Sequence, residues 1–158
     1  MRRRDLAIGL LLATAAQSAK AQEGAKQHRI AIVRPAGAVT LISDTGISFY
    51  QAFFLELRRL GDVEGQNLTV EPYSGEGRPA GYADLARDVV SRNPDVIVAV
   101  TNPITQAIRD ANGATPIVLI GGDVIEAGLA TSLARPNGNI TGVDVYAGDE
   151  ICVGIRIK

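Results

Sequence analysis

Short apolar runs alternate with amphipathic segments along most of the chain, and this alternation most constrains the fold. The apolar runs predict strands at 30–33, 68–73, 96–100, 117–120 and 140–145. Between them, apolar residues with a helical period predict two helices. Ser43 or Asp44 can cap the first, which ends at Gly61, and the second runs from Tyr82 to Asn93. Strands separated by helices form parallel sheets with helices on both faces. Right-handed crossovers then predict an α/β fold, a doubly wound parallel five-stranded sheet of order 2-1-3-4-5.

Two further helices follow the third and fourth predicted strands. Asn102 is placed to cap the first, with Pro103 at its first helical position and the Asn112-Gly113 pair at its end. Asp123 and Glu126 have the spacing of a capping box and predict a short helix after the fourth strand.

The N-terminus has the order of a secretory signal peptide. Three arginines at 2–4 precede an apolar run at 6–16, and Ala19-Lys20-Ala21 has the small-x-small pattern of a cleavage site. We expect a signal peptide at 1–21, a linker at 22–29, a solute-binding lobe at 30–148 and a periplasmic location. Loss of the leader changes the formal net charge from -1 to -4.

A ligand crevice in such a sheet lies outside the carboxyl ends of the strands, near the switch point between the first and third. Helix N-termini at this edge suit an anionic group, and glycines let a ligand approach the backbone closely. An Asp side chain suits an ammonium group, and a Tyr ring suits an apolar group. Helix capping alone also explains Asn102 and Asp123, and surface packing alone explains Tyr146. The candidate ligand-binding residues are Pro35, Thr101, Asn102, Gly122, Asp123 and Tyr146.

Several chemistries find no support in the residues. The chain has one histidine, His28, and one cysteine, Cys152, so we expect no His-based catalytic triad and no metal cluster. It has no Gly-Lys pair for a phosphate-binding loop, and the glycines at 75–81 lack dinucleotide-loop spacing. The basic residues form no stripe that would suit nucleic acid. We therefore expect no catalytic residue, no metal, no cofactor and no nucleic-acid partner.

Four segments resemble those of the ABC-transporter substrate-binding protein family, which has a type I periplasmic-binding, tryptophan-binding-like fold. The run Leu-Ala-Arg-Pro-Asn-Gly-Asn-Ile-Thr-Gly at 133–142 is the most specific, and the similar segments at 60–71, 93–98 and 115–118 accompany it. The likeness extends from about Arg29 to Glu150. It implies two lobes that close around a small organic solute, amino acids among them, and deliver it to an ABC permease in the inner membrane.

The family pattern continues beyond Glu150 into a second lobe, whereas residues 149–158 fit no pattern of the family. We therefore expect a chain truncated to its N-terminal lobe, with an aberrant tail and weak solute binding. Two alternatives remain open at this point. One is a stand-alone sensor domain that dimerises to supply the missing lobe. The other is an enzyme that uses Asp123 and Asp144 as a carboxylate acid/base pair.

Overall fold

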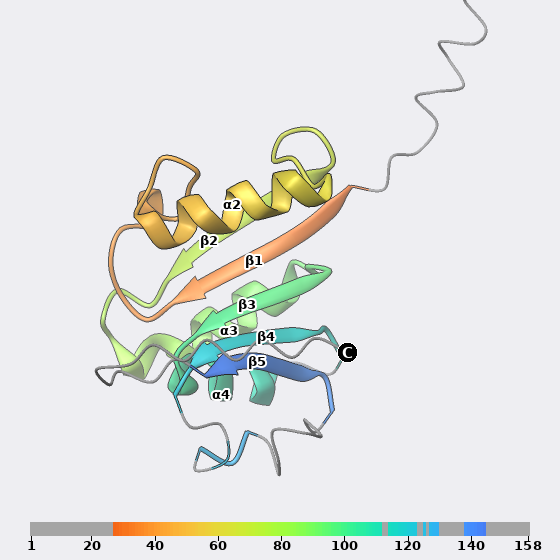
Figure 1. Cartoon of the computed structure of the whole chain (residues 1–158). Coiled ribbons are helices and arrows are strands. Elements are labelled where there is room, and N and C mark those ends of the chain that lie inside the picture. Colours follow the sequence, from red (N-terminus) through yellow and green to blue (C-terminus); the bar gives the residue numbers. More distant parts are fainter. Residues whose placement is uncertain (1–26, 112–113, 123–124, 126, 130–137, 145–158) are drawn as a thin grey trace, which may run out of the picture.

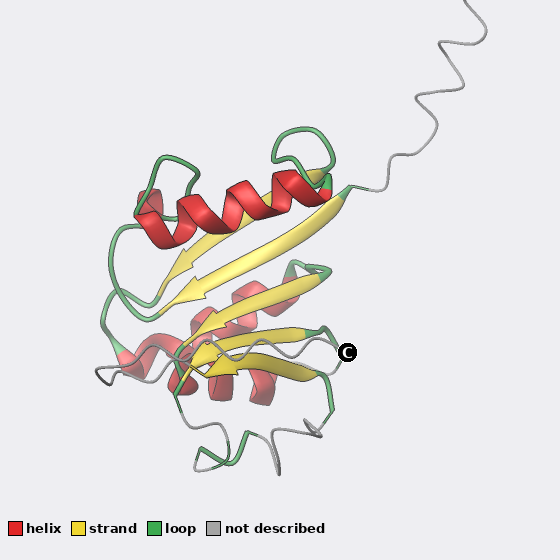
Figure 2. Ribbon diagram, in the orientation of Figure 1, coloured by secondary structure: helices red, strands yellow, loops and turns green. Residues whose placement is uncertain are grey.

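A computed structural model of the protein describes residues 27–111, 114–122, 125, 127–129 and 138–144. Its strands are β1 (His28–Arg34), β2 (Leu68–Ser74), β3 (Val96–Val100), β4 (Ile117–Gly121) and β5 (Ile140–Asp144). Its helices are α2 (Ser48–Leu60), α3 (Tyr82–Ser91) and α4 (Asn102–Ala111), with the 3-10 turns η1 (Val39–Leu41) and η2 (Pro79–Gly81). Strands and helices alternate from β1 to β4, as the sequence predicts (Figure 1, Figure 2).

The described strands form one parallel sheet of order β2-β1-β3-β4-β5, which confirms the predicted topology. Val33 of β1 pairs with Ala99 of β3, and Val100 pairs with Ile120 of β4. Because all the strands run in the same direction, the carboxyl ends of β1, β3 and β4 meet at one edge of the sheet (Figure 1). This edge, which we call the carboxyl edge, is where the crevice of a doubly wound fold lies.

Helix α2 covers the β1–β2 side of one face of the sheet (Figure 1). Its buried aromatic side chains, Tyr50 and Phe54, pack on Ile32, Val70 and Val98 from three adjacent strands. Aliphatic strand residues next to a pair of rings bury a large apolar area, which is the main stabilising contribution on this face.

Helices α3 and α4 cover the opposite face and supply the larger core (Figure 2). The side chains in this core that are almost fully buried include Val33, Val89, Ile97, Ala99, Ile104, Ile108, Ile117 and Leu119. With few aromatics available, the core is built from Val, Ile, Leu and Ala, as expected for strands that are buried on both faces.

The first strand and the first long helix differ from the predicted boundaries. β1 begins at His28, inside the predicted linker, because its backbone N–H donates to the Asn67 carbonyl at 2.8 Å and extends the pairing with β2. The predicted helix start at Ser43 or Asp44 is wrong. A turn in which the Gly46 N–H donates to the Ser43 carbonyl at 3.1 Å separates these residues from α2, which begins at Ser48.

The predicted end of α2 at Gly61 is confirmed. Gly61 has φ 98°, a left-handed conformation that glycine adopts without strain, and its N–H donates to the Arg58 carbonyl at 3.1 Å. The predicted helix at 123–126 and the turn at 112–113 lie outside the described residues. Within the described ranges, no helix is both long and apolar enough to cross a membrane.

Candidate functional site

The carboxyl edge brings together four of the six residues predicted to bind ligand. Pro35 follows β1, Thr101 and Asn102 follow β3, and Gly122 follows β4. These three strands are adjacent in the sheet, so residues from distant parts of the chain lie in neighbouring loops. Asp123 and Tyr146 lie outside the described residues, and the Asp144 side chain is likewise undescribed.

Thr101 has the most unusual backbone at this edge. Its φ is 79°, which is rare for a β-branched residue and costs about 1–3 kcal/mol of strain. Hydrogen bonds hold it in place: its N–H donates to the Ile120 carbonyl at 2.8 Å, and its carbonyl accepts the N–H and hydroxyl of Thr105 at 3.1 and 2.9 Å. Strain of this kind clusters at ligand sites, because the fold must present one particular backbone geometry there.

The same hydrogen bonds correct the predicted start of α4. The Thr101 carbonyl accepts the first intrahelical bond while its own backbone is non-helical, so Thr101 and not Asn102 occupies the capping position. Asn102 is the first helical residue and Pro103 the second. The interpretation of Asn102 as a helix cap is therefore wrong.

Asn102 lies directly against the end of β4. A Cβ on Gly121 would come within 2.6 Å of the Asn102 Oδ1 atom and 2.8 Å of a Leu119 methyl carbon, so a larger residue there would require both side chains to move. Gly122 differs, because a Cβ at this position would meet nothing within 4 Å. Of the two glycines, Gly121 serves close packing between the loops, and Gly122 leaves open space at the edge.

Pro35 is used in part to position the neighbouring loop. Its carbonyl accepts the N–H of Gly77 at 2.9 Å, and the Tyr82 hydroxyl lies 3.5 Å away. The preceding carbonyl, that of Arg34, accepts the N–H of Gly75 at 2.9 Å. The end of β1 is thus tied to the β2–α3 connection, and the Pro35 carbonyl is directed to that loop and not to solvent.

Arg34 was absent from the predicted ligand-binding residues, although it ends β1 at the same edge. Its guanidinium carbon lies 6.0 Å from the centre of the Tyr50 ring, within cation–π range. Burial raises the pKa of Tyr50 above its ordinary value, and the positive charge of Arg34 partly opposes that rise. The sequence signal for Arg34 is a charged residue directly after the apolar run at 30–33.

A groove of about 450 Å³ lies at the β1–β2 end of the carboxyl edge. It is lined by residues 36–40, which lead from β1 into η1, by Ser74 at the end of β2 and by Glu76 just after it. The sequence did not predict this groove. Its walls come from two loops whose approach depends on the parallel pairing of β1 with β2.

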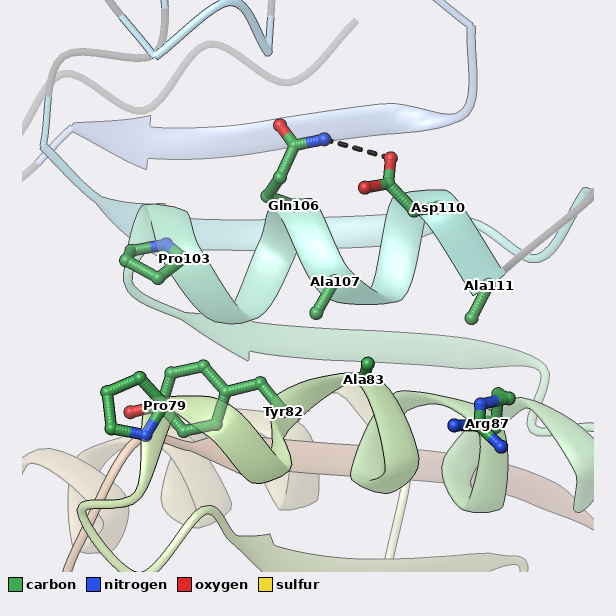
Figure 3. Close-up of a pocket in the computed structure, with 9 residues that line it drawn as sticks. All are labelled: Pro79, Tyr82, Ala83, Arg87, Pro103, Gln106, Ala107, Asp110 and Ala111. Carbon is green, nitrogen blue, oxygen red and sulfur yellow. Dashed lines mark hydrogen bonds between the residues drawn. The ribbon is translucent and has the colours of Figure 1, made fainter.

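A second groove of about 520 Å³ runs between α3 and α4 (Figure 3). Alanine and proline side chains dominate its walls, and Gln106 donates to Asp110 across one turn of α4 at 2.8 Å. None of the predicted ligand-binding residues lines it. In the described part of the chain, no cluster of three or more His, Cys, Asp or Glu side chains is arranged to hold a metal.

The sheet order, the helices on both faces and the loops gathered at the carboxyl edge define one lobe of a periplasmic-binding-protein fold. A conserved domain protein from Vibrio cholerae has the same fold with a TM-score of 0.65 and 30% identity, over 76% of this chain and 39% of that one. An ABC domain in complex with L-Trp from Streptococcus pneumonia matches with a TM-score of 0.64 and 22% identity, over 77% of this chain and 39% of that one.

The chain belongs to the ABC transporter substrate binding protein family, which it matches over residues 38–158. A tyrosine-binding protein of Clostridioides difficile (strain R20291) is 30% identical over 97 residues. That alignment covers 61% of this chain and 28% of the relative. The chain therefore spans well under half the length of these relatives, and the predicted resemblance to this family is confirmed.

Proposed function

We propose that this protein is the solute-binding component of an ABC import system, and that its carboxyl edge forms one side of the solute site. The solute class is a small, amino-acid-like organic molecule, and the partner is an ABC permease of the inner membrane. Membership of the family supports the role, and the names of two similar proteins, which mention tyrosine and L-Trp, support the solute class.

One observation carries the location of the site. The strained backbone of Thr101, the adjacent Asn102 and the open space at Gly122 come together at a single sheet edge, from segments 20 residues apart in the chain. Such an edge offers backbone donors and polar side chains to a ligand without the cost of rearranging them. Asp123 and Tyr146 are proposed to extend this site from the loops that follow β4 and β5.

The test is a titration of the isotope-labelled chain with single L-amino acids, followed by backbone amide NMR. We expect shifts of the amides at 34, 36–37, 101–102 and 121–122, with amides at the opposite edge, such as Asn67 and Asp95, unchanged. Because the described residues line the proposed site from one side, we expect an affinity weaker than micromolar for this chain. Shifts confined to the α3–α4 groove, or no shift with any amino acid, would refute the proposed site.

We infer further that residues 1–21 direct export and are removed, and that residues 30–148 form the lobe that works in the periplasm. Residues 149–158 are proposed to stand outside that lobe. The measurement is cell fractionation followed by N-terminal sequencing of the secreted chain. A periplasmic product that begins at Gln22 is expected, whereas a product that keeps Met1 in the cytoplasm contradicts the inference.

A further inference from the structure

Arg34 differs from the other arginines of the described part of the chain. Each of the others forms an ion pair with an Asp or Glu side chain: Arg29, Arg58, Arg59, Arg78, Arg87, Arg92 and Arg109. Arg34 has no such partner among the described residues, and its Nη1 atom is buried there without a hydrogen bond. A buried guanidinium N–H without an acceptor is unfavourable, so its position calls for a physical reason.

Among the described residues, the Arg34 guanidinium makes packing contacts at the carboxyl edge and no ion pair. Side chains alternate along β1, so Arg34 shares the α2 face with Ile32, where the ring of Tyr50 lies 6.0 Å away. On another side lies Gly37, whose φ is 93° and where a Cβ would come within 3.1 Å of the Arg34 Nη2 atom. Neither neighbour accepts a hydrogen bond from the guanidinium, so within the described residues the Arg34 Nη1 atom has no acceptor.

The surroundings favour an anion from outside the chain. Gly37 also lines the 450 Å³ groove, so the guanidinium lies immediately beside a wall of that groove. The acidic side chain that lines the same groove, Glu76, is already paired with Arg78. A planar guanidinium with free in-plane donors matches the two oxygens of a carboxylate, which accepts two parallel hydrogen bonds.

We propose that Arg34 binds the carboxylate of the solute, so that the protein selects free carboxylic acids, including α-amino acids, over the corresponding amines. This inference rests on the proposed function, because it assigns a chemical class to the solute of that site. Tyr50 and Gly37 are positioning residues: they pack against the guanidinium and accept none of its hydrogen bonds.

The experiment follows the arginine side-chain N–H signals of the full, isotope-labelled chain by NMR, with the Arg34 signal assigned from Arg34→Lys. The probes are sodium acetate, L-tryptophan and tryptamine, which lacks the carboxylate. We expect acetate and L-tryptophan to shift the Arg34 signal in a saturable manner, with tryptamine and the seven paired arginines showing no such response. Equal shifts of all arginines with acetate would indicate unspecific anion binding and overturn the inference.

Variants provide the second measurement. Arg34→Lys keeps the charge but removes the planar fork, and we expect it to weaken L-tryptophan binding by about tenfold or more. Arg58→Lys is the matched control, because Arg58 is an exposed residue paired with Asp44, and its binding should equal that of the unaltered chain. Thermal unfolding of both variants checks that they remain folded.

The outcomes separate the two proposals. If L-tryptophan shifts the amides at 101–102 and 121–122 while the Arg34 signal stays unchanged, the role of Arg34 is refuted and the proposed function stands. If neither these amides nor the Arg34 signal responds to L-tryptophan, to other L-amino acids or to acetate, both proposals fail.

Discussion

The guanidinium carbon of Arg34 lies 6.0 Å from the centre of the Tyr50 ring, which connects the end of β1 to the first turns of α2. Tyr50 is buried and also makes an edge contact with Phe49, with ring centres 5.1 Å apart. The contact fixes a cation at the edge of the sheet where the loops of the proposed solute site meet.

The Arg34–Tyr50 contact should appear as a coupling energy. In a double-mutant cycle with Arg34→Met and Tyr50→Leu, we expect about 0.5–2 kcal/mol, the range for a partly desolvated cation–π pair. Urea unfolding of the four proteins gives the value. Tyr50→Phe is the control, since it keeps the ring and should keep most of the coupling. Additive effects of the two substitutions would show that the contact contributes nothing to stability.

Replacing Thr101 by glycine should stabilise the fold. The substitution removes the strain of a β-branched residue at φ 79°, which exceeds the entropic cost of glycine, so the free energy of unfolding should rise by about 1 kcal/mol. Asn93→Gly is the matched control, because asparagine tolerates its φ of 51°, and its effect should stay within about 0.5 kcal/mol. A clear loss of stability in Thr101→Gly would contradict the claim that the Thr101 backbone is strained.

Gly46 should not tolerate a side chain. A Cβ there would lie 2.0 Å from the Leu41 carbonyl oxygen, which is backbone and cannot rotate away, so Gly46→Ala should cost about 1–3 kcal/mol of unfolding free energy. Gly81→Ala is the control, because its Cβ would meet nothing within 4 Å and its φ of -89° suits alanine. Urea unfolding gives the free energy of unfolding of both variants. Equal losses in the two variants would contradict the close approach of Gly46 to the Leu41 carbonyl.

Acid should weaken the fold through Glu71. Hydrogen bonds from Arg29, and from the Tyr73 hydroxyl at 2.7 Å, lower the pKa of Glu71 below its ordinary value of 4.5. Because the pKa of Glu71 is lower in the folded state, its contacts stabilise the fold fully above the pKa of the unfolded state. This contribution is lost as the pH falls through the pKa of the folded state. Urea unfolding between neutral pH and about pH 3 should therefore show a smaller acid loss in Glu71→Gln than in the unaltered chain.

Glu76→Gln is the control for the acid experiment. Glu76 pairs with Arg78 on the surface, where both side chains are well exposed, so its removal should leave the pH dependence nearly unchanged. An equal reduction in both variants would show that the acid loss reflects net charge and not the Arg29–Glu71–Tyr73 contacts.

Much of the fold followed from pattern alone. β3 spans Val96–Val100 as predicted, and α3 begins at Tyr82, because an unbroken apolar run and a 3.6-residue apolar period are local signals. The predicted start of α2 is wrong because Ser and Asp suit turns as well as helix caps. Here Ser43 and Asp44 lie in a turn closed by the Gly46 N–H, and α2 begins only at Ser48. Thr101 and not Asn102 caps α4 for a similar reason, since both residue types suit that position.

The candidate site was predictable in position but not in detail. That Thr101, Asn102 and Gly122 meet at one edge follows from the order of parallel strands, which the alternation of strands and helices already implies. That no described carboxylate pairs with Arg34 was not predictable, because it depends on which acidic side chains come near it. Likewise, the different roles of Gly121 and Gly122 depend on how closely Asn102 approaches.

By itself, the sequence determined the class of fold, the strand order and the edge at which the candidate ligand-binding residues gather, because hydrophobic periodicity and crossover handedness are properties of local chain segments. Only the tertiary structure decided that Thr101 is strained, that a side chain at Gly121 would meet those of Asn102 and Leu119, and that Arg34 lies beside Tyr50 and Gly37 without an ion-pair partner among the described residues. These features arise from contacts between segments far apart in the chain, where distances of a few tenths of an ångström decide the outcome.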